Sequence, residues 1–178
     1  EPIATMYHFD LPYALQEKGG WSNRATVEAF ATYSRTLFEA FGDRVKYWLT
    51  INEQNMMILH GDALGTKHVD AANPMKDLYQ QNHHRLVAQA KAMSLCHRLL
   101  PEAKIGPAPN ISAIYPASCK PEDVLAANTF SAIRNWLYLD MAVYGRYNAT
   151  AWRFLEERSA APIIGEGDME ILASAKPD

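Results

Sequence analysis

The sequence predicts an α/β fold in which βα units build a parallel sheet. Short apolar segments alternate along the chain with longer segments of helical periodicity, which is typical of such units. The apolar segments begin near residues 3, 46 and 104. A repeat of roughly 40 to 60 residues leaves room in each unit for a strand, a helix and a large loop on one side of the sheet.

The first predicted unit contains a strand from Ile3 to Phe9, an almost unbroken apolar run. Such a run is expected for a strand that is covered on both faces. Asn23 is placed to cap a helix from about Arg24 to Phe41, in which apolar side chains recur at helical spacing. Gly42 follows this helix and suits the left-handed backbone that ends many helices.

The second and third predicted units have the same order of elements. A strand from Lys46 to Ile51 precedes an irregular region, residues 56–75, and a helix from about Asp77 to Leu100. A third strand, Lys104 to Asn110, precedes a loop and a helix that runs from Pro121 to Tyr144, with proline and acidic residues in its first turn. Two short helices complete the chain, about Ala149 to Arg158 and Met169 to Ala175, the second capped by Asp168.

Composition excludes several classes of function. The 178 residues are enough for one core, and a formal net charge of -3 without a basic run argues against nucleic acid as a partner. No apolar stretch approaches the roughly 20 residues that span a bilayer, so we expect no membrane contact. Cys96 and Cys119 are scattered, which is typical of free thiols in a cytoplasmic protein. We expect no cofactor. We read His83 and His84 as structural residues and expect no metal site, because their spacing does not suit one.

Polar side chains gather where the predicted strands end. His8 and Asp10 end the first strand, Asn52 and Glu53 the second, and Asn110 the third. Because the carboxyl ends of parallel strands meet at one edge, these groups are expected around one cleft. Histidine and asparagine can donate and accept hydrogen bonds, as sugar hydroxyls require, and a partly desolvated carboxyl group suits a general acid. The plainer interpretation is a structural histidine and a solvated Asn-Glu turn.

These residues resemble glycoside hydrolase family 1, the family of β-glucosidases and 6-phospho-β-glucosidases. Thr50 to Glu53 resembles the family signature Thr-Phe/Ile-Asn-Glu, and Tyr7 to Pro12 resembles the segment Tyr-His-Trp/Phe-Asp-Leu/Met-Pro. Gly19 to Trp21 and Phe41 to Trp48 also match, and weaker similarity continues over essentially the whole chain. One departure is Gln54, where many members of the family carry proline.

The resemblance implies a (β/α)₈ TIM barrel, of which residues 1–178 supply a single segment, roughly strands 3 to 5 with their helices. It implies that Glu53 is the general acid/base, that Asn52 binds the sugar 2-hydroxyl and that His8 binds the 3-hydroxyl. Asn110 is expected to face the cleft and bind substrate, whereas Asp10 is expected to be structural. The substrate would be a β-glucoside or a 6-phospho-β-glucoside.

The second carboxylate of a retaining glycosidase is missing from the sequence. It lies about 5 to 5.5 Å from the first, and in this family it belongs to an Ile/Val-Thr-Glu-Asn-Gly segment that does not occur here. We therefore expect the nucleophile outside this chain, and a chain that is inactive and self-associating when alone. One alternative is a non-catalytic sugar-binding or interaction module derived from the same fold. Another, an unrelated α/β enzyme, would require the motif matches to be chance.

Overall fold

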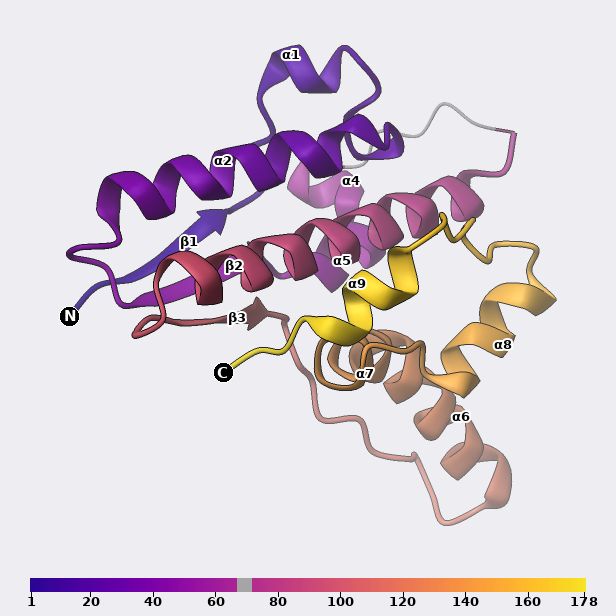
Figure 1. Ribbon diagram of the computed structural model, residues 1–178. Helices are drawn as coiled ribbons and strands as arrows, with labels where there is room; N and C mark the ends of the chain where they lie inside the picture. Colours follow the sequence, from indigo (N-terminus) through magenta and orange to yellow (C-terminus); the bar gives the residue numbers. More distant parts are fainter. Residues whose placement is uncertain (67–71) are drawn as a thin grey trace.

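The computed structural model describes residues 1–66 and 72–178 and confirms the α/β prediction. Strands β1 (Ile3–Tyr7), β2 (Tyr47–Asn52) and β3 (Lys104–Ala108) form a parallel sheet in the order β1-β2-β3 (Figure 1). Their ends differ from the predicted ends by one or two residues. The sheet is thus built from consecutive βα units, and its three carboxyl ends lie on the same side.

Helices account for most of the remaining chain. In chain order they are α1 (Tyr13–Gln16), η1 (Gly20–Ser22), α2 (Ala25–Phe41), α3 (Gln54–Leu59), α4 (Gly61–Leu64), α5 (Pro74–Leu99), α6 (Pro121–Ser131), η2 (Ala132–Trp136), α7 (Leu137–Tyr144), α8 (Ala149–Glu157) and α9 (Asp168–Ser174). None of the described helices is long and apolar enough to cross a membrane.

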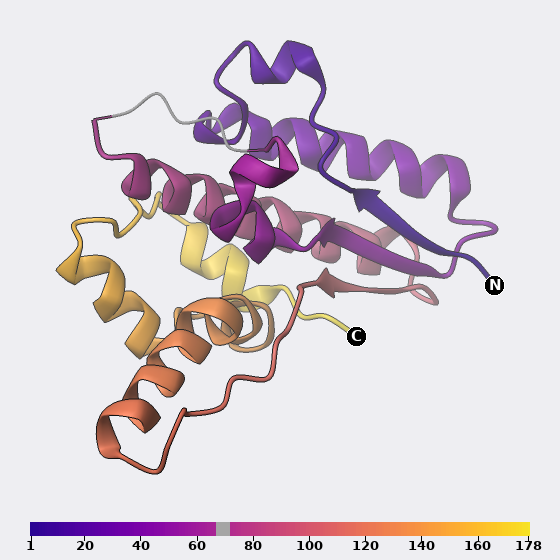
Figure 2. The ribbon, with the colours of Figure 1, turned by 180° about the vertical axis from the view of Figure 1, so that it is seen from behind.

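Helices α2 and α5 cover one face of the sheet, and Figure 2 shows the strands in front of them from the other side. The Phe38 ring of α2 meets the Trp48 ring of β2 edge-on, with 5.1 Å between centroids. The Thr50 hydroxyl donates to Oε1 of Gln89 on α5 at 2.8 Å. Coverage of both faces, expected for the first strand, is not observed, because Ile3 stays 67% exposed and Tyr47 of β2 stays 41% exposed.

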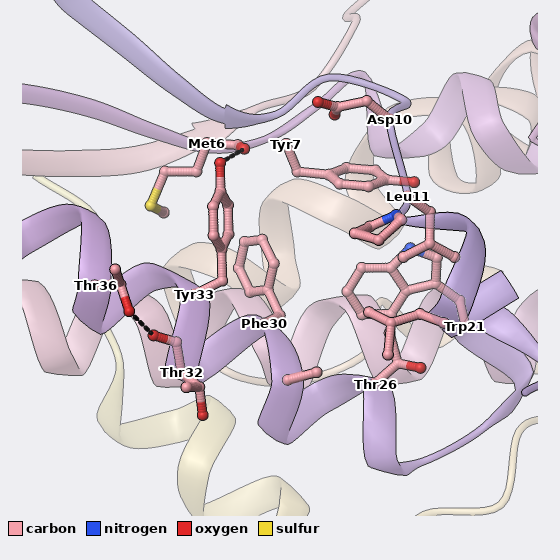
Figure 3. A pocket seen from close by; sticks show the side chains of 13 residues that line it. Met6, Tyr7, Asp10, Leu11, Trp21, Thr26, Phe30, Thr32, Tyr33 and Thr36 are labelled. Carbon is pink, nitrogen blue, oxygen red and sulfur yellow. Dashed lines mark hydrogen bonds between the residues drawn. The ribbon is translucent and has the colours of Figure 1, made fainter.

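A pocket of about 610 Å³ lies between β1 and α2 (Figure 3). Its walls are largely apolar and include the rings of Trp21, Phe30 and Tyr33. The Tyr33 hydroxyl donates to the backbone oxygen of Met6 at 3.1 Å, which ties the helix to the strand. This side of the molecule therefore carries apolar surface next to the strand edge of β1.

The prediction for Gly42 was wrong, although glycine is needed there. Its φ is −63°, in the right-handed region. A Cβ atom at Gly42 would lie 2.3 Å from Cδ2 of Leu100 and 2.5 Å from the backbone oxygen of Phe38. The glycine thus permits the end of α2 to approach the end of α5, where a larger residue would collide with both.

Three further predictions need correction. The region 56–75, predicted irregular, contains the end of α3, helix α4 and the start of α5, while residues 67–71 lie outside the described residues. The single helix predicted from Pro121 to Tyr144 is divided by the π-helical segment η2. Asp168 does not cap α9, since Gly167 with φ 79° holds that position and Asp168 is the first helical residue.

Candidate active site

The four residues predicted to form the site lie together at the carboxyl edge of the sheet. His8 follows β1, Asn52 ends β2, Glu53 follows it and Asn110 lies two residues beyond β3. Nδ2 of Asn52 lies 3.2 Å from Nε2 of His8, and Nδ2 of Asn110 lies 2.7 Å from Oε1 of Glu53. His8 is exposed and the other three are partly buried, so the group faces an open edge.

Glu53 is held in an uncommon backbone conformation, with φ 43° and ψ 48°. Such a left-handed residue costs about 1 kcal/mol and persists only where its surroundings impose it. Here its N–H donates to the oxygen of Ala108 at 2.8 Å, and its carbonyl accepts from the N–H of Met56 at 2.8 Å. These bonds join the end of β2 to the neighbouring strand and to α3, and they direct the carboxylate towards Asn110.

Asn110 is fixed through both its backbone and its side chain. Its N–H donates to Oδ1 of Asn55 at 3.1 Å, and its carbonyl accepts from Nδ2 of Asn55 at 2.7 Å. Arg134 of η2 donates through Nη2 to Oδ1 of Asn110 at 2.7 Å and through Nη1 to the same residue's carbonyl. Asn55 and Arg134 therefore fix the orientation of the Asn110 amide that contacts Glu53.

Sequence reasoning missed Asn55 and Arg134. Asn55 is fully buried and donates also to the carbonyl of Arg134 at 3.0 Å. Its place two residues after Glu53, within a polar run that ends a strand, was a usable signal. No sequence pattern pointed to Arg134, because it lies 24 residues after Asn110 in a segment whose 3.6-residue periodicity predicts an ordinary helix.

Two neighbours of the site support the loops. Asp10 accepts the backbone N–H of His8 on Oδ1 at 2.9 Å, so its carboxylate holds the turn after β1. Gln54, the departure from the family's usual proline, is buried and donates through Nε2 to the backbone oxygen and Oδ1 of Asn82. The side chain at position 54 thus anchors the start of α3 to α5.

A second polar network lies in the interior, around Asp168. The carboxylate of Asp168 is fully buried and accepts from both terminal nitrogens of Arg24, from Nε2 of His83 at 2.9 Å and from the N–H of Gly165 at 2.8 Å. Nδ1 of His83 lies 2.8 Å from the Tyr147 hydroxyl. This network joins α2, α5 and the start of α9.

Burial and pairing set the charges in this second network. Burial lowers the pKa of His83, and the hydrogen bond to Asp168 only partly offsets it. For Asp168 burial alone would raise the pKa, but hydrogen bonds from Arg24 and His83 outweigh it, so the pKa is lowered. A neutral histidine that donates to an ionised carboxylate is the state that fits. Within residues 1–66 and 72–178, no group of three His, Cys, Asp or Glu side chains is arranged to hold a metal ion.

The chain is similar in sequence and in fold to known glycosidases. The family model for glycosyl hydrolase family 1 matches residues 1–178. The aryl-phospho-β-D-glucosidase BglC of Bacillus subtilis is 43% identical over 100% of this chain, and β-glucosidase A of Acetivibrio thermocellus is 37% identical over 97%. The β-glucosidase of Thermotoga maritima in complex with glucoimidazole superposes with a TM-score of 0.86 at 35% identity, over 98% of this chain. The chain spans 37%, 38% and 39% of these proteins, respectively.

Proposed function

Because this chain belongs to glycosyl hydrolase family 1, we propose that it is part of a retaining β-glycosidase that hydrolyses β-glucosides or 6-phospho-β-glucosides. The observation that carries this proposal is the carboxylate of Glu53 at the carboxyl edge of the sheet, hydrogen-bonded to Asn110 and adjacent to the Asn52–His8 pair. In this proposal the three strands are strands 3 to 5 of a (β/α)₈ barrel, and the whole cleft requires the other strands.

Glu53 acts in two steps of the proposed reaction. As a carboxylic acid it protonates the departing glycosidic oxygen while a second carboxylate, outside this chain, attacks the anomeric carbon. As a carboxylate it then takes a proton from the water that hydrolyses the glycosyl-enzyme. Asn52 and His8 bind the 2- and 3-hydroxyls, for which their amide and imidazole groups supply donors and acceptors. Asn110 has a second amide hydrogen for a substrate oxygen.

The phosphorylated sugar is the favoured substrate within this proposal. Relatives of 43% and 41% identity are an aryl-phospho-β-D-glucosidase and a 6-phospho-β-glucosidase, whereas a 1,4-β-D-glucan glucohydrolase is 40% identical and the β-glucosidase A cited above is 37% identical. Comparing kcat/KM for an aryl β-glucoside and its 6-phosphate in the complete enzyme tests this choice. A higher kcat/KM for the unphosphorylated glucoside would reverse it.

The role of Glu53 is tested by Glu53→Gln in the complete enzyme, with aryl glucosides that have good and poor leaving groups. General acid catalysis contributes roughly 10²- to 10⁴-fold, and a poor leaving group depends on it most. We expect kcat/KM to fall by about that factor for the poor leaving group and much less for the good one. Equal losses for both substrates would refute the acid role.

The isolated chain is expected to be inactive and to self-associate. The motivation is the missing nucleophile, the strand edge of β1 and the apolar pocket beside it. Sedimentation of the purified 178-residue chain and an assay with an aryl β-glucoside 6-phosphate test both points. A clean monomer contradicts the expected self-association, and turnover contradicts the expected inactivity. Saturable sugar binding without turnover, in the complete natural protein, would instead favour a non-catalytic module.

A further inference from the structure

Arg134 determines which way the Asn110 amide faces. A guanidinium has five N–H donors and no acceptor. Its Nη2 lies 2.7 Å from one atom of the Asn110 amide, and that atom must therefore be the oxygen. The NH₂ group is then left to face Oε1 of Glu53 at 2.7 Å. The direction of this hydrogen bond follows from the chemistry of arginine, because a reversed amide would set two donors against each other.

Arg134 is itself well placed to impose this orientation. It is 7% exposed, and it grips Asn110 at both the side-chain oxygen and the backbone oxygen. Nη2 also reaches Oγ of Ser112 at 3.2 Å and Sδ of Met56 at 3.4 Å. A planar guanidinium with two contacts to one residue is geometrically specific in a way that a single point charge is not.

The two oxygens of Glu53 are consequently different. Oε1 receives a hydrogen bond from Asn110, so a proton on Oε1 would meet a donor. Among the described residues no hydrogen bond reaches Oε2. We infer that Arg134 is a positioning residue that, through Asn110, makes Oε2 the oxygen that carries and delivers the proton. This inference rests on the proposed acid role of Glu53.

The test is Arg134→Met in the complete enzyme, which removes the donors and keeps an unbranched chain. The freed amide of Asn110 can turn its oxygen to Glu53 and accept a hydrogen bond from the carboxylic acid, which holds the proton away from the substrate. We expect kcat/KM to fall about 10- to 100-fold for a phenyl glucoside, a part of the usual general acid contribution, and less than about 3-fold for a dinitrophenyl glucoside. Both substrates are used as 6-phosphates if that form is preferred.

Two further variants separate positioning from stability. Arg153→Met on α8, where the arginine side chain is 80% exposed, is the matched control and should leave both rates unchanged. Asn110→Ala removes the donor directly and should show the same dependence on leaving group, also if Arg134→Met does not fold. The double variant should lose no more than the larger single loss, because the two residues act in series.

The outcomes distinguish this inference from the proposed function. If Glu53→Gln shows the dependence on leaving group and neither Arg134→Met nor Asn110→Ala does, the positioning role is overturned and the acid role stands. Equal losses for both substrates in Arg134→Met mark the arginine as merely structural. If Glu53→Gln itself shows no such dependence, the acid role fails and the inference fails with it.

Discussion

Two networks in the described part of the chain, one around Asp168 and one around Glu53, each combine an arginine with a carboxylate. They differ in how many hydrogen bonds the carboxylate accepts. In the interior, Asp168 is fully buried and accepts four hydrogen bonds, from Arg24, His83 and Gly165. At the sheet edge, Glu53 is partly buried and accepts one side-chain hydrogen bond from the described residues, that of Asn110, whose amide oxygen is in turn bound by Arg134.

This difference indicates that Asp168 stabilises the fold, whereas Glu53 is available for proton transfer. A carboxylate whose oxygens are all occupied cannot exchange a proton without breaking the fold around it. A carboxylate with one oxygen held and the other without a partner in the described part of the chain keeps a fixed direction and a free atom. The same change, from carboxylate to amide, should therefore have opposite consequences at the two positions.

The largest effect on stability is expected from Asp168→Asn. The amide cannot accept at both atoms, so Arg24 loses its charged partner and one buried donor faces another. Leaving a buried donor without its acceptor costs about 1 to 3 kcal/mol of unfolding free energy, and the loss at Arg24, whose side chain is 44% exposed, adds little to it. Urea unfolding of the complete enzyme measures it, with Asp43→Asn, which removes an exposed pair with Arg44, as the control. Equal midpoints for Asp168→Asn and the control would show that the buried network stabilises nothing.

The pH dependence of stability should report the same network. Burial lowers the pKa of His83 below its ordinary value of 6.5, and burial likewise lowers that of His84. Below about pH 6.5 these two histidines are therefore protonated in the unfolded chain but remain neutral in the folded chain. The free energy of unfolding then falls as the pH drops, by at most about 1.4 kcal/mol per pH unit for each histidine. In His83→Gln the slope between pH 6.5 and 5 should be smaller, and an unchanged slope would contradict this account.

The smallest effect on stability is expected from Glu53→Gln, although its effect on catalysis should be the largest. The glutamine oxygen can still accept from Asn110, and no other side-chain hydrogen bond of Glu53 is lost among the described residues. The free energy of unfolding should change by less than about 0.5 kcal/mol. A loss comparable to that of Asp168→Asn would mean that the edge carboxylate is structural as well.

The sequence predicted the strands and most helices because hydrophobic periodicity reflects burial against the sheet. It also predicted one shared edge for His8, Asn52, Glu53 and Asn110, because the carboxyl ends of parallel strands lie on the same side. It did not predict contacts that join distant segments. Asp168 resembles a helix cap in sequence, but Arg24 and His83 lie 144 and 85 residues away. Gly42 was misjudged for a related reason, since its constraint comes from Leu100 rather than from its own backbone.

Arg134 lies in the π-helical segment Ala132–Trp136, so the number of residues in this segment sets the direction of the Arg134 side chain. Each residue of an α-helix advances the chain by about 100° around the axis, and a π-turn holds one residue more than an α-turn. Deleting one residue before Arg134 would restore a regular helix and turn the guanidinium away from Asn110, with every contacting residue still present. The position of Arg134 around the helix axis, rather than the identity of any side chain, would then determine the orientation of the Glu53 carboxyl group.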